Sequence, residues 1–240
     1  EAASRRLAEF FAARAETVDP EARQTALRRH MYHLIGADIV EGLRSFERMC
    51  RLARQQLRYA ECAALIKMVH DYDAILSDSQ RATVSYHEAK LASDMRDWVT
   101  AERLLQVLVD SVTLNVVLRV KANLRLGYVL AQQGKLQLAL AACQRARDLA
   151  EGDPIAGATM PRVLHELGVT YRDLGEQDKA MRLLRESVDR ASANGEWSSF
   201  AIAQNSLGGL YLKQRLAGNA IKAFHASLER LDLAHDPLRL

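Results

Sequence analysis

The apolar and small residues of this chain follow a pattern that repeats in three segments, 124–146, 164–187 and 204–227. Each segment contains Leu-Gly, an apolar residue three positions after the Gly and an Ala twelve positions after it. A larger apolar residue follows four positions later, and a small residue comes three positions after that. Small residues let two helices approach closely, and the larger residue fills the space beside them. The pattern therefore predicts a pair of packed helices in each segment.

Each copy of the pattern has three packing positions, named here its first, second and third anchors. The clear copies have, in that order, Gly127, Ala139 and Cys143, then Gly168, Ala180 and Leu184, then Gly208, Ala220 and Phe224. Two weaker copies have Cys50, Cys62 and Ile66, then Ala89, Ala101 and Leu105. The first anchors are 39, 38, 41 and 40 residues apart. A random bundle of helices would not keep so steady a period.

This spacing resembles that of the tetratricopeptide repeat family, in a longer variant of about 40 residues rather than the commoner 34 or so. The resemblance covers residues 38–235 and is weakest in the first two copies, where the Leu-Gly pair is lost. It implies an all-α fold: a right-handed superhelical solenoid of antiparallel helix hairpins, about 12 helices in all, with a concave and a convex face. The expected repeats are 38–74, 78–112, 114–152, 155–194 and 196–235, after an N-terminal helix pair at 1–37 that caps the array or links it to an upstream domain.

Turns between the helices are expected where small, polar or chain-breaking residues interrupt the pattern. These places are Gly36-Ala-Asp, Ser77-Asp-Ser, Gly134-Lys, Glu151-Gly-Asp-Pro, Gly175-Glu, Asn194-Gly and Ala217-Gly218-Asn. Composition agrees with a helical protein, because only 12 glycines, 4 prolines and 6% aromatic residues accompany 49% apolar and 26% charged residues. No apolar run approaches the 18 or so residues that cross a bilayer, so no membrane partner is expected.

The search for catalytic motifs finds none of the usual patterns. The chain has no GxxxxGK[ST] phosphate loop, no GxGxxG and no GxSxG. His30 and His33 are three residues apart on a predicted helix and could present two metal ligands, but no third ligand is identifiable, so surface histidines are the expectation. Cys50, Cys62 and Cys143 form no disulfide framework, which indicates a reducing, cytoplasmic compartment. We expect no enzyme activity, no cofactor and no metal.

The concave face is the expected binding surface. By helical period, the positions −6, −3, −2, +1, +4 and +5 from each first anchor line or border this face. Across five copies these thirty positions hold ten Lys or Arg against four Asp or Glu, whereas the whole chain has 33 against 30. The candidate partner-binding residues among them are Arg44, Arg48, Arg51, Arg54, Tyr86, Lys90, Lys121, Arg125, Tyr128, Arg162, His165, Arg172, Asn205 and Lys213.

The densest cations form an arginine strip on one predicted helix. Its members are Arg44, Arg48, Arg51, Arg54 and Arg58, which fall within about 120° of arc. One interpretation is the solvated face of an amphipathic helix, and the other is a site that grips carboxylate or phosphate groups. Asn205 suits contact with a peptide backbone, because its amide both donates and accepts hydrogen bonds. Tyr86 and Tyr128 offer flat apolar surface beside the charges.

The stretch Arg29-His-Met-Tyr-His-Leu-Ile-Gly-Ala-Asp, followed by Arg44-Ser-Phe-Glu and then long repeats, looks like the C-terminal sensor regions of bacterial signal-transduction ATPases with numerous domains (STAND). The resemblance implies that the repeat array detects a ligand and releases an upstream nucleotide-binding switch. Any ATPase activity would lie outside this chain. The start at Glu1, without an initiator Met, and the end just after Asp236-Pro237-Leu238 lead us to expect a piece of a longer protein.

Three functions follow from these observations. The leading one is a non-catalytic scaffold that recognises an acidic protein or peptide segment in a basic concave groove. The family resemblance implies the recognition of a protein or peptide, and the charges of the groove positions indicate that the segment is acidic. The alternative is a structural scaffold that self-associates through its convex and end surfaces. Nucleic-acid binding is disfavoured by the net charge of only +3 and by the lack of interleaved aromatic and basic residues.

Overall fold

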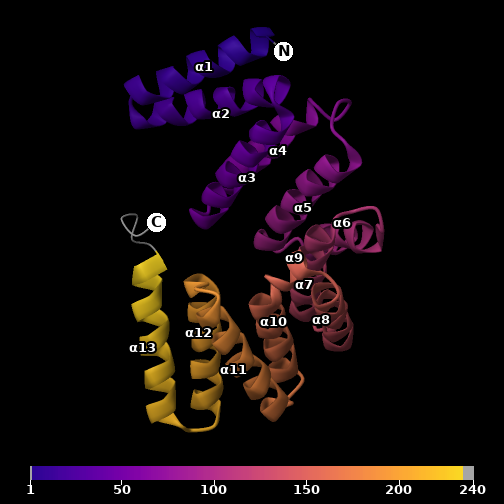
Figure 1. The fold of residues 1–240 in the computed structure, drawn as a ribbon, viewed down its shortest axis with the longest axis vertical. Coiled ribbons are helices and arrows are strands. Elements are labelled where there is room, and N and C mark those ends of the chain that lie inside the picture. Colours follow the sequence, from indigo (N-terminus) through magenta and orange to yellow (C-terminus); the bar gives the residue numbers. More distant parts are fainter. Residues whose placement is uncertain (1, 235–240) are drawn as a thin grey trace. The chain divides into compact units, whose positions relative to one another are not determined.

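The computed structural model describes residues 2–234, and of positions 20, 21 and 231–234 it describes the backbone only. These residues form helices without any strand (Figure 1). The helices are α1 (Ala2–Thr17), α2 (Pro20–Ala37), α3 (Ile39–Gln55), α4 (Tyr59–His70), α5 (Asp78–Asp94), α6 (Trp98–Asp110), α7 (Val116–Gln132), α8 (Leu136–Glu151), α9 (Pro154–Gly157), α10 (Met160–Asp173), α11 (Gln177–Ala193), α12 (Trp197–Lys213) and α13 (Ala217–Ala234). The predicted all-α class is confirmed, with thirteen helices in this part of the chain rather than about twelve. Residue 235, which ends the fifth expected repeat, and the segment 236–238 lie outside the described residues.

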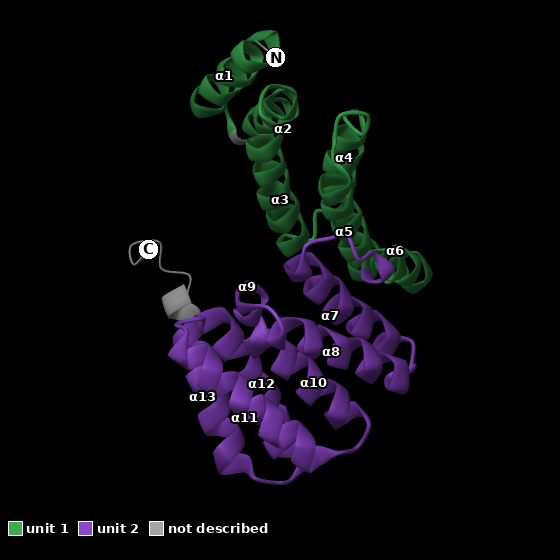
Figure 2. Ribbon diagram, turned by 45° about the vertical axis from the view of Figure 1, so that its right-hand side comes forward, with its two compact units in different colours: residues 1–108 green, residues 109–240 purple. Residues whose placement is uncertain are grey.

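The chain divides into two compact units, residues 1–108 and residues 109–240 (Figure 2). In the first unit, α1 packs on α2 and α3 packs on α4. In the second unit, α7 packs on α8, α10 on α11 and α12 on α13. This antiparallel pairing is consistent with a tetratricopeptide-type solenoid. The boundary between the two units falls two residues before the end of α6. The boundaries of the five expected repeats, and of the expected N-terminal helix pair at 1–37, stay predictions.

The anchors of the last three copies meet as their spacing predicts. A Cβ added at Gly127 would lie 2.6 Å from Sγ of Cys143, and one at Gly168 would lie 2.8 Å from Cγ of Leu184. A Cβ at Gly208 would lie 2.5 Å from the ring of Phe224. No side chain larger than hydrogen fits at these positions without a shift. Each glycine therefore lets a first helix approach the second helix of its pair.

A left-handed residue follows each of the five first anchors by seven positions. These residues, with φ between 57° and 85°, are Leu57, Arg96, Gly134, Gly175 and Arg215. The N–H of the next residue donates in every case to the carbonyl five positions earlier, at 2.8 to 2.9 Å. This is the hydrogen bond that closes a Schellman cap at the C-terminus of a helix. The backbone therefore keeps one register in all five copies, including the two whose anchors are weak.

One of the expected turns is wrong, and the turn expected at 36–38 falls at the last of these residues, Asp38. Gly218 lies inside α13, because Arg215 takes the left-handed position of the fifth copy. Gly36 lies inside α2, where it serves close packing rather than a turn. A Cβ there would lie 3.1 Å from Oγ of Ser4 and 3.2 Å from the hydroxyl of Tyr72. The chain turns at Asp38 instead, whose side chain accepts from the N–H of Glu41 and caps α3.

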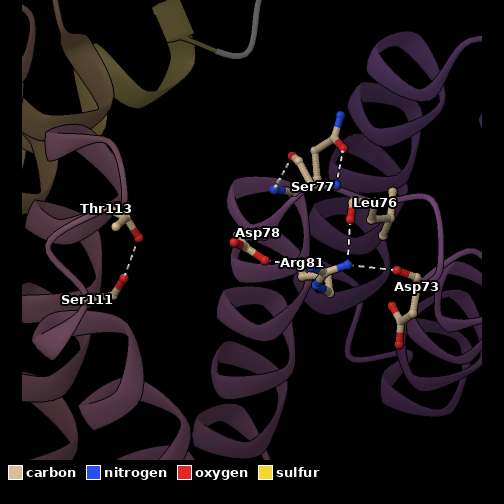
Figure 3. A network of polar contacts seen from close by, with 8 residues as sticks. Asp73, Leu76, Ser77, Asp78, Arg81, Ser111 and Thr113 are labelled. Atoms are coloured by element: carbon tan, nitrogen blue, oxygen red, sulfur yellow. Dashed lines mark hydrogen bonds and ion pairs between the residues drawn. The ribbon is translucent and has the colours of Figure 1, made fainter.

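Arg81 holds the connection between α4 and α5 (Figure 3). Its guanidinium donates to the carbonyls of Asp73 and Leu76, at 2.8 and 2.5 Å, and to the side chain of Asp78. Ser77 begins α5 with a capping box, in which its hydroxyl and the side chain of Gln80 each bind the other residue's backbone N–H. The segment from His70 to Ser77 is thereby tied to the first turn of α5.

Helices α7, α10 and α12 form one layer of the second unit, named here the first layer. Helix α10 contacts both α7 and α12, and each of the three packs on its own second helix, α8, α11 or α13. Two serines of the second helices, one on α11 and one on α13, each donate a hydrogen bond to a carbonyl of the first layer. Ser187 donates to the carbonyl of Pro161 at 2.6 Å, and Ser227 donates to that of Ala201 at 2.7 Å. Both serines occupy the predicted small position three residues after the third anchor.

Candidate binding surfaces of the two units

Four arginines of the strip lie on α3 of the first unit, and three of these reach solvent; Arg58 lies beyond the turn at Leu57 and begins α4, so the strip does not continue along one helix as predicted. Arg44 is exposed and pairs with Glu41 one turn earlier at 3.1 Å. Arg48 is exposed and has a long hydrogen bond, 3.5 Å, to the hydroxyl of Ser45. Arg51 is exposed as well. Surface pairs of this kind are weak, so these guanidinium groups can exchange their partners for a ligand.

Arg54 differs from the rest of the strip. Its Nε donates to Oδ2 of Asp94 on α5 at 2.6 Å, and only 11% of its side chain is exposed. Its charge is thus largely neutralised by a residue one repeat further along the chain. The fifth arginine, Arg58, pairs with Glu61 at 2.6 Å. The strip therefore presents fewer available cations than its spacing predicts.

The two remaining candidates of the first unit are on α5. Tyr86 is 8% exposed, so its ring is part of the core rather than a surface for a ligand. Nζ of Lys90 lies 5.5 Å from the centre of that ring, within range of a cation–π contact. Burial of Tyr86 was missed because the helical period alone does not say how closely α5 is covered by its neighbours.

In the second unit, the candidates on α7 lie along one side of the helix. Lys121 is exposed, Arg125 is half-buried and Tyr128 is 39% exposed. The guanidinium carbon of Arg125 lies 5.5 Å from the centre of the Tyr128 ring. This contact holds a cation beside an exposed aromatic face.

A polar cluster connects α10 to both of its neighbours in the first layer. On α10, Nε2 of His165 is hydrogen-bonded to the hydroxyl of Ser206 on α12 at 2.9 Å. The other ring nitrogen of His165, Nδ1, lies 3.6 Å from Oε1 of Glu166. Burial by itself would raise the pKa of Glu166, whose side chain is 20% exposed. The contact with His165 and the charges of His165, Arg162 and Arg125 outweigh burial and lower that pKa. The carboxylate is therefore stabilised by a positive local potential.

The other candidates of the second unit are Arg172, Asn205 and Lys213. Arg172 pairs with its neighbour Asp173 at 2.8 Å. Asn205 and Lys213, both on α12, are exposed. The structure thus gathers Arg125, Arg162 and His165 around Glu166. Glu166 and Ser206 lie at groove positions of the pattern, but nothing in their spacing marks them as the residues that join the cluster.

The histidine pair of α2 packs against α1. Nδ1 of His30 lies 2.9 Å from the carbonyl of Ala8, and the ring of His33 stacks on Phe11 with 5.6 Å between centres. Burial, followed by the charge of Arg29, lowers the pKa of His33. Within the described part of the chain, no group of three or more His, Cys, Asp or Glu side chains could hold a metal ion.

All three cysteines are buried, free thiols. A hydrogen bond between Cys50 and Cys62, together with burial, raises the pKa of Cys50. Burial and the nearby charge of Glu166 raise the pKa of Cys143 to about 12. Protonated, buried thiols are poor nucleophiles, which suits Cys50 and Cys143 as packing residues. None of the described helices is long and apolar enough to cross a membrane.

Comparisons with known proteins support the fold and add little beyond it. The tetratricopeptide repeat family matches residues 118–193, which span α7 to α11. No curated protein matches the chain. Among solved structures, a Rap protein complexed with competence and sporulation factor has a TM-score of 0.68 at 12% identity and covers 89% of this chain and 65% of its own.

Two further structures have the same fold. The TPR-like repeats of a putative kinesin light chain from Podosopora anserina give a TM-score of 0.55 at 18% identity, covering 81% of this chain and 97% of their own. The apo form of RapI gives 0.61 at 13% identity, covering 78% and 69%. Tetratricopeptide repeats are typically non-catalytic and bind proteins or peptides. Residues 118–193 therefore match the tetratricopeptide repeat family in sequence, and the chain shares the fold of the solved structures named here.

Proposed function

We propose that the first layer of the second unit binds an acidic segment of a partner protein. The observation that carries this proposal is a partly buried carboxylate, Glu166, with Nδ1 of His165 at 3.6 Å and with Arg162 and Arg125 close enough for their charges to lower its pKa. An acidic side chain of a partner that approached the same cations would be stabilised for the same reason. Arg125 beside Tyr128 adds an apolar surface next to the charge. The exposed arginines of α3, Arg44 and Arg51, offer a second surface of the same sign.

The experiment is fluorescence polarisation with a labelled oligo-glutamate peptide as the probe. The test variant carries Arg125→Gln and Arg162→Gln, and its matched control carries Arg145→Gln and Arg182→Gln, two exposed arginines of α8 and α11. We expect the test variant to lose about tenfold or more in affinity and the control to change little, because charge-assisted hydrogen bonds are lost only in the former. Equal affinities for the two variants would overturn the proposal.

The second surface needs its own variant. Replacing Arg54 with an acidic residue would break its buried ion pair with Asp94, so a loss of binding could reflect a loss of stability. Arg44→Glu with Arg51→Glu avoids this problem, since both side chains are exposed. Weaker peptide binding by that variant, with an unchanged helical circular dichroism spectrum, would assign the strip to the same function; unchanged affinity would leave α3 as a solvated helix face.

We further propose that the chain is the non-catalytic, cytoplasmic sensor of a larger STAND-type ATPase. Support comes from the stretch at 29–38, which resembles such sensors, and from three buried thiols that suit a reducing compartment. One structural neighbour was solved in complex with competence and sporulation factor, so this fold accommodates that factor in that protein. The test is ATP hydrolysis by the full-length gene product, with and without its cognate ligand. A full-length product without nucleotide binding would refute the sensor proposal and leave peptide binding untouched.

Self-association remains a second candidate, favoured by one observation on α13. Ile221 and Leu228 are 66% and 63% exposed and lie two turns apart on the same side of that helix. The residues forty positions earlier, Met181 and Val188, pack into the core of the second unit. Ile221→Lys with Leu228→Lys should convert any oligomer to a monomer in analytical ultracentrifugation. A wild-type chain that is already monomeric at every concentration would dismiss this candidate.

A further inference from the structure

A cavity of about 450 Å³ lies in the first unit, between α4, α5 and the beginning of α6. Each helix contributes one stripe of residues at helical spacing. The stripes are Ala63, Ile66, Lys67 and His70 on α4, Glu88, Leu91, Ala92 and Met95 on and just after α5, and Asp97, Thr100, Arg103 and Leu104 around the start of α6. None of these residues is a candidate of the peptide-binding surface.

The wall of the cavity is apolar and partly open to solvent. Ile66 and Leu91 are 5% and 8% exposed, so they form a fixed floor. Met95 is 58% exposed and has a flexible, polarisable side chain that adapts to an apolar guest. Small-molecule sites have volumes of about 300–1,000 Å³ and walls of this kind, whereas a protein partner needs about 800 Å² of surface on each side. The size of the cavity favours a small molecule.

The acidic groups of the cavity are already satisfied by the fold. Glu88 accepts from Nε2 of His70 at 2.8 Å. Asp97 accepts from the N–H of Thr100 at 3.1 Å and caps α6, and its hydrogen bonds with Thr100 lower its pKa. The cations of the cavity are less constrained. Lys67 and Arg103 are exposed, and among the described residues neither has a hydrogen bond or an ion-pair contact, although the charge of Arg103 also helps to lower the pKa of Asp97.

We propose that this cavity binds a small amphipathic carboxylate, with its apolar chain on Ile66 and Leu91 and its carboxylate between Lys67 and Arg103. Two cations from different helices, α4 and α6, border one apolar chamber, and this arrangement complements a molecule with one anionic end. The site is separate from the peptide-binding surface proposed above. It gives the first unit a ligand-binding role of its own.

Isothermal titration calorimetry of the whole chain with decanoate, kept below its micelle concentration, tests the proposal. Decanamide and decylamine have the same chain length without the carboxylate. We expect decanoate to bind and both analogues to bind at least about tenfold more weakly, because decanamide lacks the negative charge that the two cations attract and the protonated amine of decylamine is repelled by them. Absence of decanoate binding, or equal binding of the analogues, would overturn the proposal.

Three variants locate the site. Lys67→Gln with Arg103→Gln should weaken decanoate binding by about tenfold or more, and Ala63→Phe should abolish it by filling the cavity from an exposed position. Arg145→Gln, which removes an exposed cation from α8, is the matched control and should change nothing. Wild-type affinity in the first two variants would refute the assignment. Displacement of decanoate by the oligo-glutamate probe would also refute it, because the cavity would then belong to the peptide surface.

Discussion

Gly208 and Gly209 are neighbours in α12 with opposite surroundings. A Cβ on Gly208 would strike the Phe224 ring, with atoms 2.5 to 2.7 Å away, whereas a Cβ on Gly209 would meet nothing within 4 Å. The first glycine is therefore needed for helix packing. The second only weakens its helix, because glycine loses more backbone entropy on folding than alanine does.

Alanine substitution separates these two roles. Gly208→Ala should lower the free energy of unfolding by about 1–3 kcal/mol, since the aromatic ring must move in a packed interface. Gly209→Ala should raise it by up to about 1 kcal/mol through helix propensity. Urea unfolding of both variants, followed by circular dichroism, measures the difference. A similar loss in both would show that α12 is misplaced on α13.

The left-handed caps make a second prediction at single residues. Arg215 adopts φ of 60° without being a glycine, whereas Gly175 occupies the equivalent position of the preceding copy with φ of 85°. A side chain in this conformation costs about 1 kcal/mol or more. Arg215→Gly should therefore stabilise the chain by up to about 1 kcal/mol, and Gly175→Ala should destabilise it by about as much, both measured by urea unfolding. If Arg215→Gly lowered the free energy of unfolding and Gly175→Ala raised it, the helix caps at these two positions would not have the left-handed conformation described here.

At the scale of helices, His70 links α4 to α5 and to the segment between them. Its Nδ1 lies 2.9 Å from Asp73 and its Nε2 lies 2.8 Å from Glu88, so both ring nitrogens can donate only when the imidazole is protonated. Burial alone would lower the pKa of His70. Hydrogen bonds with Glu88 and Asp73, and the charges of both carboxylates, raise it above 6.5 instead.

This raised pKa makes stability depend on pH with a definite sign. Protonated His70 is favoured in the folded state, so its contribution is fully present below pH 6.5 and is lost as the pH rises through the higher folded pKa. The stability difference between about pH 6 and pH 8 should therefore be larger in the wild type than in His70→Gln. Urea unfolding of both proteins at the two pH values gives the comparison. An identical pH dependence would show that the bridge contributes nothing.

At the scale of the whole molecule, charge distinguishes a protein partner from a nucleic acid. The chain carries only three more positive than negative charges. Binding to several phosphates releases several counterions and gives a steep dependence of affinity on salt. Oligo-glutamate binding should fall only gently with salt in fluorescence polarisation, and an oligothymidylate probe should bind more weakly. A steep dependence of affinity on salt, together with tight binding of oligothymidylate, would instead favour a nucleic acid as the partner.

The amino-acid sequence by itself determined the helical class, the period of about forty residues and the anchors of the last three copies. These properties are local or periodic, because a glycine that must face a larger residue sixteen positions later leaves a visible spacing in any helix pair. The same register also places the left-handed caps. Turn composition was a poorer guide, since Arg215 rather than Gly218 closes the fifth copy.

Only the tertiary structure decided which cations are available. Arg54 and Arg51 look alike in the sequence, but one meets Asp94 forty residues away and the other remains in solvent. Glu166 and the cavity beside Lys67 depend in the same way on residues from other helices. The reason is physical: the environment of a charge is set by every group within a few ångströms, and most of those groups are distant along the chain.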